Sequence, residues 1–231
     1  MSVQNIIARA RSMLCKKKSL NEVRIFLETN AEELSHSFSE LHLETANIIL
    51  LQALNVESES RNRYLEKSLE YVDKSLNHER TADALALKCK LIGYQIGCVD
   101  YGLELSIRKA FKINQLFSEL EKEYPEHCDI PLIKGELLFH AADLSFIGRK
   151  CAQAILAVLR VGKPLRKNLK EATYKKALEN LLKYKIDNIE KNAFLLDCYY
   201  CMGNKKEAKE CFKKMLQIKN KKERTVYEKV D

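Results

Sequence analysis

Glycine and proline are scarce in this sequence, and tryptophan is missing. Only 7 of the 231 residues are Gly and 3 are Pro, well below ordinary usage. So few chain breakers favour long helices, and no segment shows the period-two run of Val, Ile and Thr that is typical of a strand. Hydrophobic residues still make up 46% of the chain, which is enough for a sizeable core. We therefore predict an all-α protein.

Long hydrophobic runs are missing as well. No stretch approaches the roughly 18 apolar residues that a membrane-spanning helix needs. The first residues, "MSVQNIIARARSMLCKKK", place their charges after the apolar positions and lack a small-residue cleavage site, so we expect no signal peptide. Eight Cys in a chain without such a signal indicate free thiols in a reducing compartment. These features predict a cytoplasmic protein.

Positive charge is concentrated in the last third of the chain. The 231 residues carry 40 Lys and Arg against 32 Asp and Glu, a net charge of +8. Residues 160–231 hold 20 of these basic residues and 10 of the acidic ones, so the whole excess lies there. A surface of one sign attracts partners of the opposite sign and speeds their association. The alternative is that lysine-rich helix faces only keep the protein soluble.

Apolar residues recur with helical spacing in segments that pair as helix–turn–helix units. Pro125 closes one segment, since proline restricts the residue before it. Ser19 and Glu22 have the spacing of a capping box at a helix start. We expect the polar tail after residue 219 to fray. The predicted helices cover residues 2–17, 19–29, 34–54, 60–76, 79–97, 101–125, 130–143, 145–160, 171–185, 189–202 and 205–219.

The last two predicted helices form the clearest repeat. Leu195, Leu196 and Tyr199 share one face of the first helix, and Gly203 turns the chain. The apolar residues of the second helix follow at helical spacing and are expected to point inward: Ala208, Phe212, Met215 and Leu216. This pattern resembles the tetratricopeptide repeat, in which a small Ala allows close helix approach and an aromatic residue fills the groove. One unit cannot bury its own apolar face, so the resemblance implies an α-solenoid of stacked antiparallel helix pairs.

Three cysteines fall inside this repeat, and Cys198 and Cys201 have C-x-x-C spacing. A zinc site needs four ligands, whereas residues 160–231 contain no His and offer only Cys211 as a third ligand. A redox pair is expected at a helix N-terminus, where the dipole lowers the thiol pKa, but this pair lies near the C-terminal end of its predicted helix. We interpret the cysteines as structural, and we predict no metal and no cofactor.

A wider pattern extends upstream of the last repeat. Residues 135–157 read "GELLFHAADLSFIGRKCAQAILA" and residues 171–184 read "EATYKKALENLLKY". In order and spacing these segments and the repeat resemble the regulator of microtubule dynamics family, whose members carry a Gly-led helix, a "LSW-x-x-RK-x-A-x-x-L"-like helix, an "ATYEEAL"-like helix and a closing repeat. The resemblance covers roughly residues 79–219, with Phe146 in place of the family's Trp and without the diproline before its "ATY" helix.

This resemblance implies a non-enzymatic helical module that associates with microtubules and the spindle. Some relatives carry an N-terminal membrane anchor and work at organelle surfaces or on lipids, and we expect this chain to be of the kind without one. It also implies tetratricopeptide-like repeats over residues 79–231, with a basic last third. We expect residues 1–78 to continue the same array or to cap it.

The basic residues of the last third are the predicted site for tubulin, whose disordered tails are acidic. Lys206, Lys209 and Lys213 are three and four residues apart and so share a helix face. Anionic lipid headgroups would suit the same surface, whereas nucleic acid is disfavoured because Lys far outnumbers Arg and no recognition motif is present. The full set is Lys163, Arg166, Lys167, Lys170, Lys175, Lys176, Lys205, Lys206, Lys209, Lys213 and Lys214.

A peptide-binding groove is an alternative site. In a stacked array the first helix of each pair lines the concave surface, which in the last repeat predicts Ala193, Asp197 and Tyr200 as groove-lining residues. Chaperone-binding tetratricopeptide proteins hold a C-terminal carboxylate in this groove, and Asp197 would repel such a group. A scaffold for some other peptide stays open.

A second alternative concerns the segment around His140. An apolar pocket near Phe139, His140 and Phe146 would hold a lipid chain and make the protein a lipid-binding or lipid-transfer module. His140 also stands three residues before Asp143, a spacing that can orient a catalytic base. No nucleophile stands at a fixed spacing from this pair, and "GKP" at residues 162–164 lacks the frame of a phosphate-binding loop. We therefore predict no enzyme.

Overall fold

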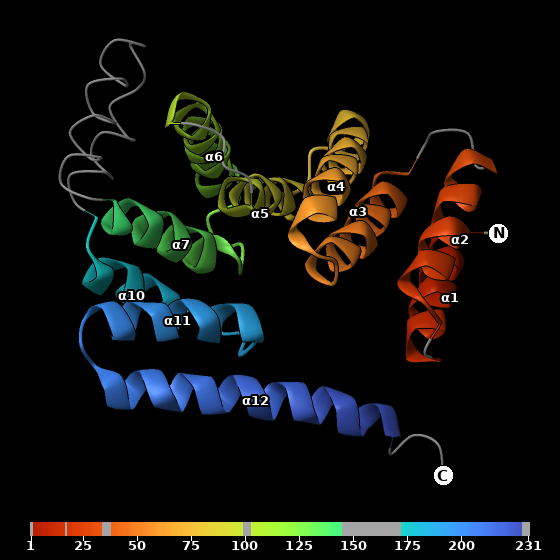
Figure 1. Cartoon of the computed structure of the whole chain (residues 1–231). Helices are drawn as coiled ribbons and strands as arrows, with labels where there is room; N and C mark the ends of the chain where they lie inside the picture. The colour runs from red at the N-terminus through yellow and green to blue at the C-terminus, as the bar shows by residue number, and fades with distance from the viewer. Residues whose placement is uncertain (1, 17, 34–37, 99–102, 145–171, 228–231) are drawn as a thin grey trace. The chain divides into compact units, whose positions relative to one another are not determined.

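The computed structural model describes residues 2–16, 18–33, 38–98, 103–144 and 172–227 (Figure 1). Within these ranges every regular element is an α-helix, and neighbouring helices pack against each other. The all-α prediction is confirmed for this part of the chain, while the tetratricopeptide-like solenoid remains a prediction. The helix predicted at residues 145–160 and the predicted basic residues between 163 and 170 lie outside the described residues.

Contacts divide the chain into two compact units, Met1–Glu123 and Tyr124–Asp231. The first unit contains α1 (Val3–Cys15), α2 (Leu20–Glu33), α3 (Ser39–Leu54), α4 (Ser58–His78), α5 (Ala82–Cys98) and α6 (Leu103–Glu123). The second contains α7 (Ile130–Asp143), α10 (Tyr174–Lys183), α11 (Ile189–Cys201) and α12 (Lys205–Tyr227). The expected roles of residues 1–78 and 79–231 stay predictions.

In the first unit each helix packs against the next one along the chain, from α1 to α6. Helices α1 to α3 bury one apolar cluster, in which Ile6, Val23 and Leu27 are fully buried. Helices α3 to α5 bury another, which includes Leu65 and Leu91. Packing between sequence neighbours is what helices joined by short loops produce.

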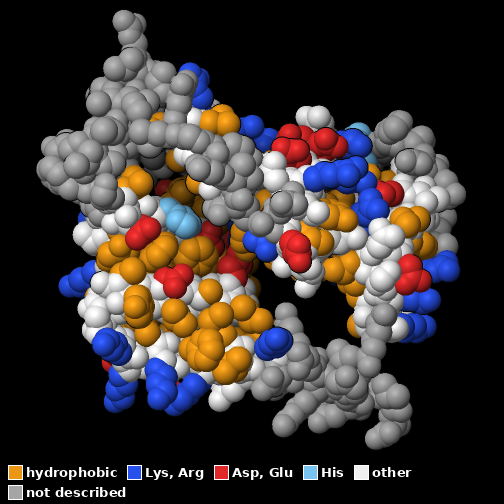
Figure 2. Space-filling view, in the orientation of Figure 1, with side chains coloured by type: hydrophobic (Ala, Val, Ile, Leu, Met, Phe, Trp, Pro, Cys, Tyr) orange, Lys and Arg blue, Asp and Glu red, His pale blue; other side chains and the backbone are white. Residues whose placement is uncertain are grey.

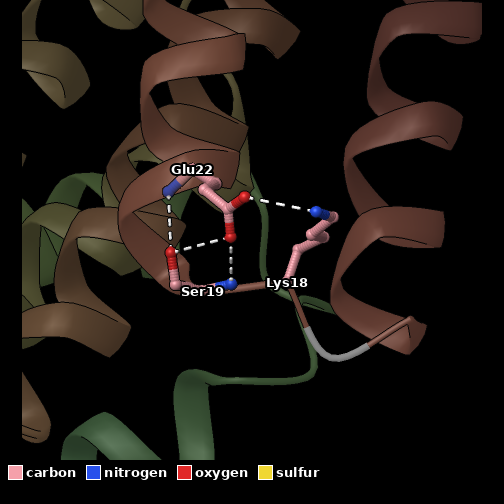
Figure 3. Close-up of polar contacts among 3 residues, drawn as sticks. All are labelled: Lys18, Ser19 and Glu22. Carbon is pink, nitrogen blue, oxygen red and sulfur yellow. Dashed lines mark hydrogen bonds and ion pairs between the residues drawn. The ribbon is translucent and has the colours of Figure 1, made fainter.

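The start of α2 shows how local sequence sets a helix end (Figure 3). The backbone N–H of Glu22 donates to Ser19 Oγ at 3.2 Å, and the backbone N–H of Ser19 donates to Glu22 Oε2 at 2.9 Å. Lys18 Nζ forms an ion pair with the other carboxylate oxygen of Glu22 at 3.3 Å. The reciprocal bonds satisfy N–H groups that have no partner within the helix. The predicted capping box is confirmed.

In the second unit α7, α10, α11 and α12 lie one beneath another (Figure 1). Helix α10 packs against both α7 and α11, and α12 packs against α11. The shared core includes Leu132, Leu181, Leu195 and Cys198. Gly135 allows the close approach of α7 and α10, because a Cβ at this position would stand 2.6 Å from Leu181 Cγ.

Gly203 ends α11 in a left-handed conformation, with φ of +79°. Its N–H donates to the carbonyl of Tyr200 at 3.0 Å, and the N–H of Asn204 donates to the carbonyl of Tyr199 at 2.8 Å. These two bonds make a Schellman motif, and glycine adopts the positive φ without steric cost. The predicted turn at Gly203 is confirmed, and α12 runs back along α11 (Figure 1).

Helix α12 is longer than the sequence predicted. We expected it to end at residue 219 and the polar tail to fray, but it continues to Tyr227. Residues 220–227 contain no Gly or Pro, and three of them are Lys or Arg. Because such residues are good helix formers, no local signal stops the helix, and the predicted end was wrong.

Candidate partner-binding surface

Helix α12 joins the second unit through one narrow seam. Ala208 and Cys211 are buried, and Met215 and Ile218 are half-buried. Their spacing of three, four and three residues is that of a helix that packs against a single neighbour. That neighbour is α11, so α12 covers the end of this stack of helices and leaves most of its circumference exposed.

The inward orientation that we expected for Phe212 and Leu216 is wrong. Phe212 is 52% exposed and Leu216 is 46% exposed. The seam on α11 runs through Cys211 instead of Phe212, which rotates the helix so that both large side chains lie at the edge of the contact. One neighbouring helix covers only part of the apolar stripe, and the rest of the stripe faces outward.

Next to these apolar residues the predicted lysines of α12 are all exposed. They are Lys205, Lys206, Lys209, Lys213 and Lys214. Lys213 Nζ forms an ion pair with Glu210 Oε1 at 2.8 Å. This bond lowers the pKa of the Glu210 carboxyl, with further contributions from the charges of Lys213, Lys206 and Lys209. The lysine face is therefore strongly cationic, although one carboxylate lies within it.

The remaining predicted basic residues stand apart from α12 in the sequence. Lys175 and Lys176 lie in the first turn of α10, and both side chains are exposed. Lys163, Arg166, Lys167 and Lys170 lie outside the described residues. The structure thus places one set of predicted lysines on α12 and another set on α10.

The predicted groove residues lie on one side of α11. Tyr200 is 69% exposed, Asp197 is exposed and Ala193 is half-buried. Their spacing of four and three residues places them on one helix face. All three side chains are at least partly accessible to a partner, and Asp197 adds a negative charge to this helix face.

A polar and aromatic cluster built from three helices lies next to Asp197. Tyr174 Oη on α10 donates a hydrogen bond to Asp143 Oδ1 on α7 at 3.0 Å. The ring centroids of Phe139 and His140 are 5.5 Å apart, and His140 meets Phe194 of α11 edge-on at 5.9 Å. The sequence spacing indicates the pair His140 and Asp143. The contact of Tyr174 with Asp143 depends on how α10 packs against α7, so the sequence does not indicate it.

Loss of hydration is the largest cause of the pKa shifts in this cluster. It lowers the pKa of His140, against the opposing charges of Asp143 and Asp197, so the imidazole is neutral near neutral pH. Asp197 is partly desolvated although its side chain is exposed, and this desolvation, followed by the charge of Asp143, raises the pKa of its carboxyl. Burial and hydrogen bonds to Asp143 and Cys201 raise the pKa of Tyr174 to about 12. Two carboxyl groups beside a neutral imidazole and aromatic rings suit a cationic ligand better than an anionic one.

The cysteines near this cluster differ in their surroundings. Cys198 and Cys211 are buried and Cys201 is exposed. Burial raises the pKa of the Cys198 thiol to about 12, the opposite of what a nucleophilic or redox thiol needs. Among the described residues no group of three or more His, Cys, Asp or Glu side chains is arranged to hold a metal ion.

Over the ranges that the structure describes, none of the helices combines the length and the apolar character required to cross a bilayer.

The sequence matches no model of a known protein family and no curated protein. The similarity to the regulator of microtubule dynamics family therefore rests on the motifs quoted above, and the microtubule partner that it implies is a proposal.

Proposed function

We propose that this chain is a non-enzymatic helical-repeat interaction protein that binds an acidic protein partner through the lysines of α12, with microtubules as the candidate partner. The observation that supports the proposal is that the five predicted lysines of α12 are exposed, while the described side chains of this helix, up to residue 219, pack against α11 along one seam. The acidic tails of tubulin are the ligand that the motif resemblance suggests. Association with the cytoskeleton and spindle is part of this proposal.

Electrostatics decides how such a complex would behave. An ion pair between exposed groups contributes about 0–1 kcal/mol, so no single lysine suffices and several must act together. Interactions between exposed charges are screened over about 8 Å at physiological ionic strength. We therefore expect fast association, modest affinity and steep weakening with added salt.

Co-sedimentation with taxol-stabilised microtubules across a salt series tests the proposal. The variant Lys206→Glu/Lys209→Glu/Lys213→Glu is expected to bind at least about tenfold more weakly, because it reverses three charges on one helix face. Microtubules stripped of their acidic tails should show a similar loss. The matched control reverses three exposed lysines of the first unit, Lys16, Lys112 and Lys122, and should bind like the wild type.

Two results would contradict the proposal. One is binding that is insensitive to salt and to tail removal, and the other is an equal loss in the control variant. Anionic liposomes belong in the same assay, since binding to liposomes but not to microtubules would favour the lipid-binding alternative.

A second candidate function, a scaffold that binds a basic peptide, is favoured by the cluster around Asp143 and Asp197. Both carboxyl groups lie close enough to His140 to influence its pKa. We expect a fluorescent lysine-rich peptide to bind more weakly to Asp197→Asn than to the wild type. Equal binding by the two proteins would rule out this second function and would leave the proposal for the lysines of α12 unaffected.

A further inference from the structure

Two parallel rows of side chains run along the outer part of α12. Phe212 and Leu216 are four residues apart and about half exposed, so they form an apolar row. Lys209 and Lys213 are also four residues apart and exposed. Each lysine precedes one of the apolar residues by three positions, which places the two rows side by side on the helix surface. Figure 2 shows hydrophobic side chains gathered on this face of the second unit, with basic side chains along its lower edge.

We propose that this double row binds an acidic amphipathic helix of a partner protein. Apolar side chains of the partner would pack on Phe212 and Leu216, while its carboxylates would pair with Lys209 and Lys213. The proposal rests on the proposed function and specifies its partner, which must carry apolar residues as well as negative charge. A helix presents rows with this same three- and four-residue spacing, so one face of a partner helix can match both rows.

A partner with acidic residues alone fits the surface less well. It would neutralise the lysines but leave two large apolar side chains in water, and burial of apolar surface is the main driving force of most protein association. An amphipathic helix binds by placing its apolar face on apolar side chains of its partner, and Phe212 and Leu216 offer such side chains beside the lysines. The exposed apolar row therefore selects among acidic partners.

Two other occupants fit worse. A second copy of the chain, placed face to face on this surface, would set each lysine row against either the other lysine row or the apolar row, so no opposite charge would neutralise it. A membrane-surface helix inserts a broad apolar face, but α12 uses Ala208 and Cys211 against α11. Among the side chains of α12 that the structure describes, up to residue 219, the apolar row that is left is too narrow for such insertion, whereas it suits a single helix.

Fluorescence anisotropy with two synthetic peptides and the full chain tests the inference. The first peptide is a helix with leucines on one face and glutamates beside them, and the second replaces the leucines by serine at the same net charge. The wild type is expected to bind the first peptide at least about tenfold more tightly than the second. The variant Phe212→Ser/Leu216→Ser should lose this preference and keep the weaker, salt-sensitive binding of both peptides.

Control variants separate the surface from general effects. Lys209→Glu/Lys213→Glu should weaken the binding of both peptides. Leu51→Ser/Leu54→Ser changes two leucines of α3 that are 42% and 44% exposed, and it should keep the preference. Phe212→Leu/Leu216→Met retains the apolar row and should also keep it, so that a folding defect in the serine variant is not mistaken for a loss of contact.

Equal binding of the two peptides by the wild type would overturn the inference. The inference would also be overturned if the serine variant kept the preference for the first peptide, or if the wild type formed a dimer that the serine variant cannot form. Binding to phosphatidylserine-containing vesicles that needs Phe212 and Leu216, with no peptide preference, would replace the inference by a membrane surface. The proposed function fails separately: salt-sensitive microtubule binding without a peptide preference retains it, whereas a peptide preference without microtubule binding removes only the microtubule partner.

Discussion

Gly135 occupies a position on α7 where any side chain would meet α10. A Cβ there would stand 2.6 Å from Leu181 Cγ and 3.3 Å from the carbonyl oxygen of Ala177. Both neighbours are fully buried, so neither moves aside freely. We expect Gly135→Ala to lower the free energy of unfolding by about 1–3 kcal/mol, the usual cost of overpacking, as measured by urea denaturation.

The control for this substitution is Gly93 in α5. A Cβ at Gly93 would meet no atom within 4 Å, and alanine is a better helix former than glycine. Gly93→Ala should therefore raise the free energy of unfolding by roughly 0.5–1 kcal/mol. A similar loss of stability at both positions would show that close helix approach is not the reason for Gly135.

Thiol reactivity tests the structural interpretation of the cysteines. A raised pKa leaves less thiolate at a given pH, and the thiolate is the reactive form. Burial raises the pKa of both Cys198 and Cys211, whereas Cys201 is exposed. At about pH 8 iodoacetamide should modify Cys201 in the folded protein and reach Cys198 and Cys211 only after unfolding, as mass spectrometry would show. Modification of Cys198 as fast as Cys201 would contradict a structural role.

At the scale of single elements, the features that depend on sequence neighbours were predictable. Ser19 and Glu22 cap α2 because the two residues of a capping box are only three positions apart, and Gly203 turns the chain because a positive φ is a property of one residue. The seam of α12 was not predictable in the same way. Ala208, Phe212 and Leu216 fit a helical period as well as Ala208 and Cys211 do, and the choice depends on which side faces α11.

The capping box of α2 also makes the stability of this helix depend on pH. Hydrogen bonds from the backbone and the side chain of Ser19 lower the pKa of Glu22 below its value in the unfolded chain, and Lys18 adds to the effect. A carboxyl group with a lowered folded pKa stabilises the fold above its unfolded pKa, and this contribution is lost as the pH falls through the folded pKa. The wild type should therefore exceed Glu22→Gln in stability near neutral pH and lose that advantage as the pH falls below the ordinary glutamate pKa of about 4.3 and through the folded pKa of Glu22.

Thermal denaturation of both proteins across this pH range measures the effect. Glu210 offers a comparison, because its pKa is lowered by a lysine on the surface of α12 and not by a backbone N–H. Added salt should screen the contribution of Glu210 and leave most of the contribution of Glu22. A stability difference at Glu22 that stays constant with pH would contradict the capping role.

At the scale of the whole molecule, the sequence indicates that the fold is all-α, but it does not indicate where the chain divides into two units. Scarce Gly and Pro and helical periodicity predict an all-α chain. Both features are averaged over many residues, so a departure at a few positions does not change the prediction. The separation of contacts between Glu123 and Tyr124 depends on which helices share a core, and no composition shift marks it. The charge asymmetry was visible from counts alone, but the apolar row beside the lysines needed the packing of α12 on α11.

Each unit has its own buried clusters, and this leads to a prediction about unfolding. The cluster around Leu181 and Leu195 lies wholly in the second unit, and the cluster around Leu65 and Leu91 lies wholly in the first. Removing buried methyl groups by Leu181→Ala should cost about 2–5 kcal/mol. Since cooperative units lose amide protection together, hydrogen exchange should then quicken in α7, α10 and α11 while α3 to α5 keep their protection. Leu65→Ala should give the reciprocal pattern, and equal loss in both units from either variant would show one cooperative structure instead of two.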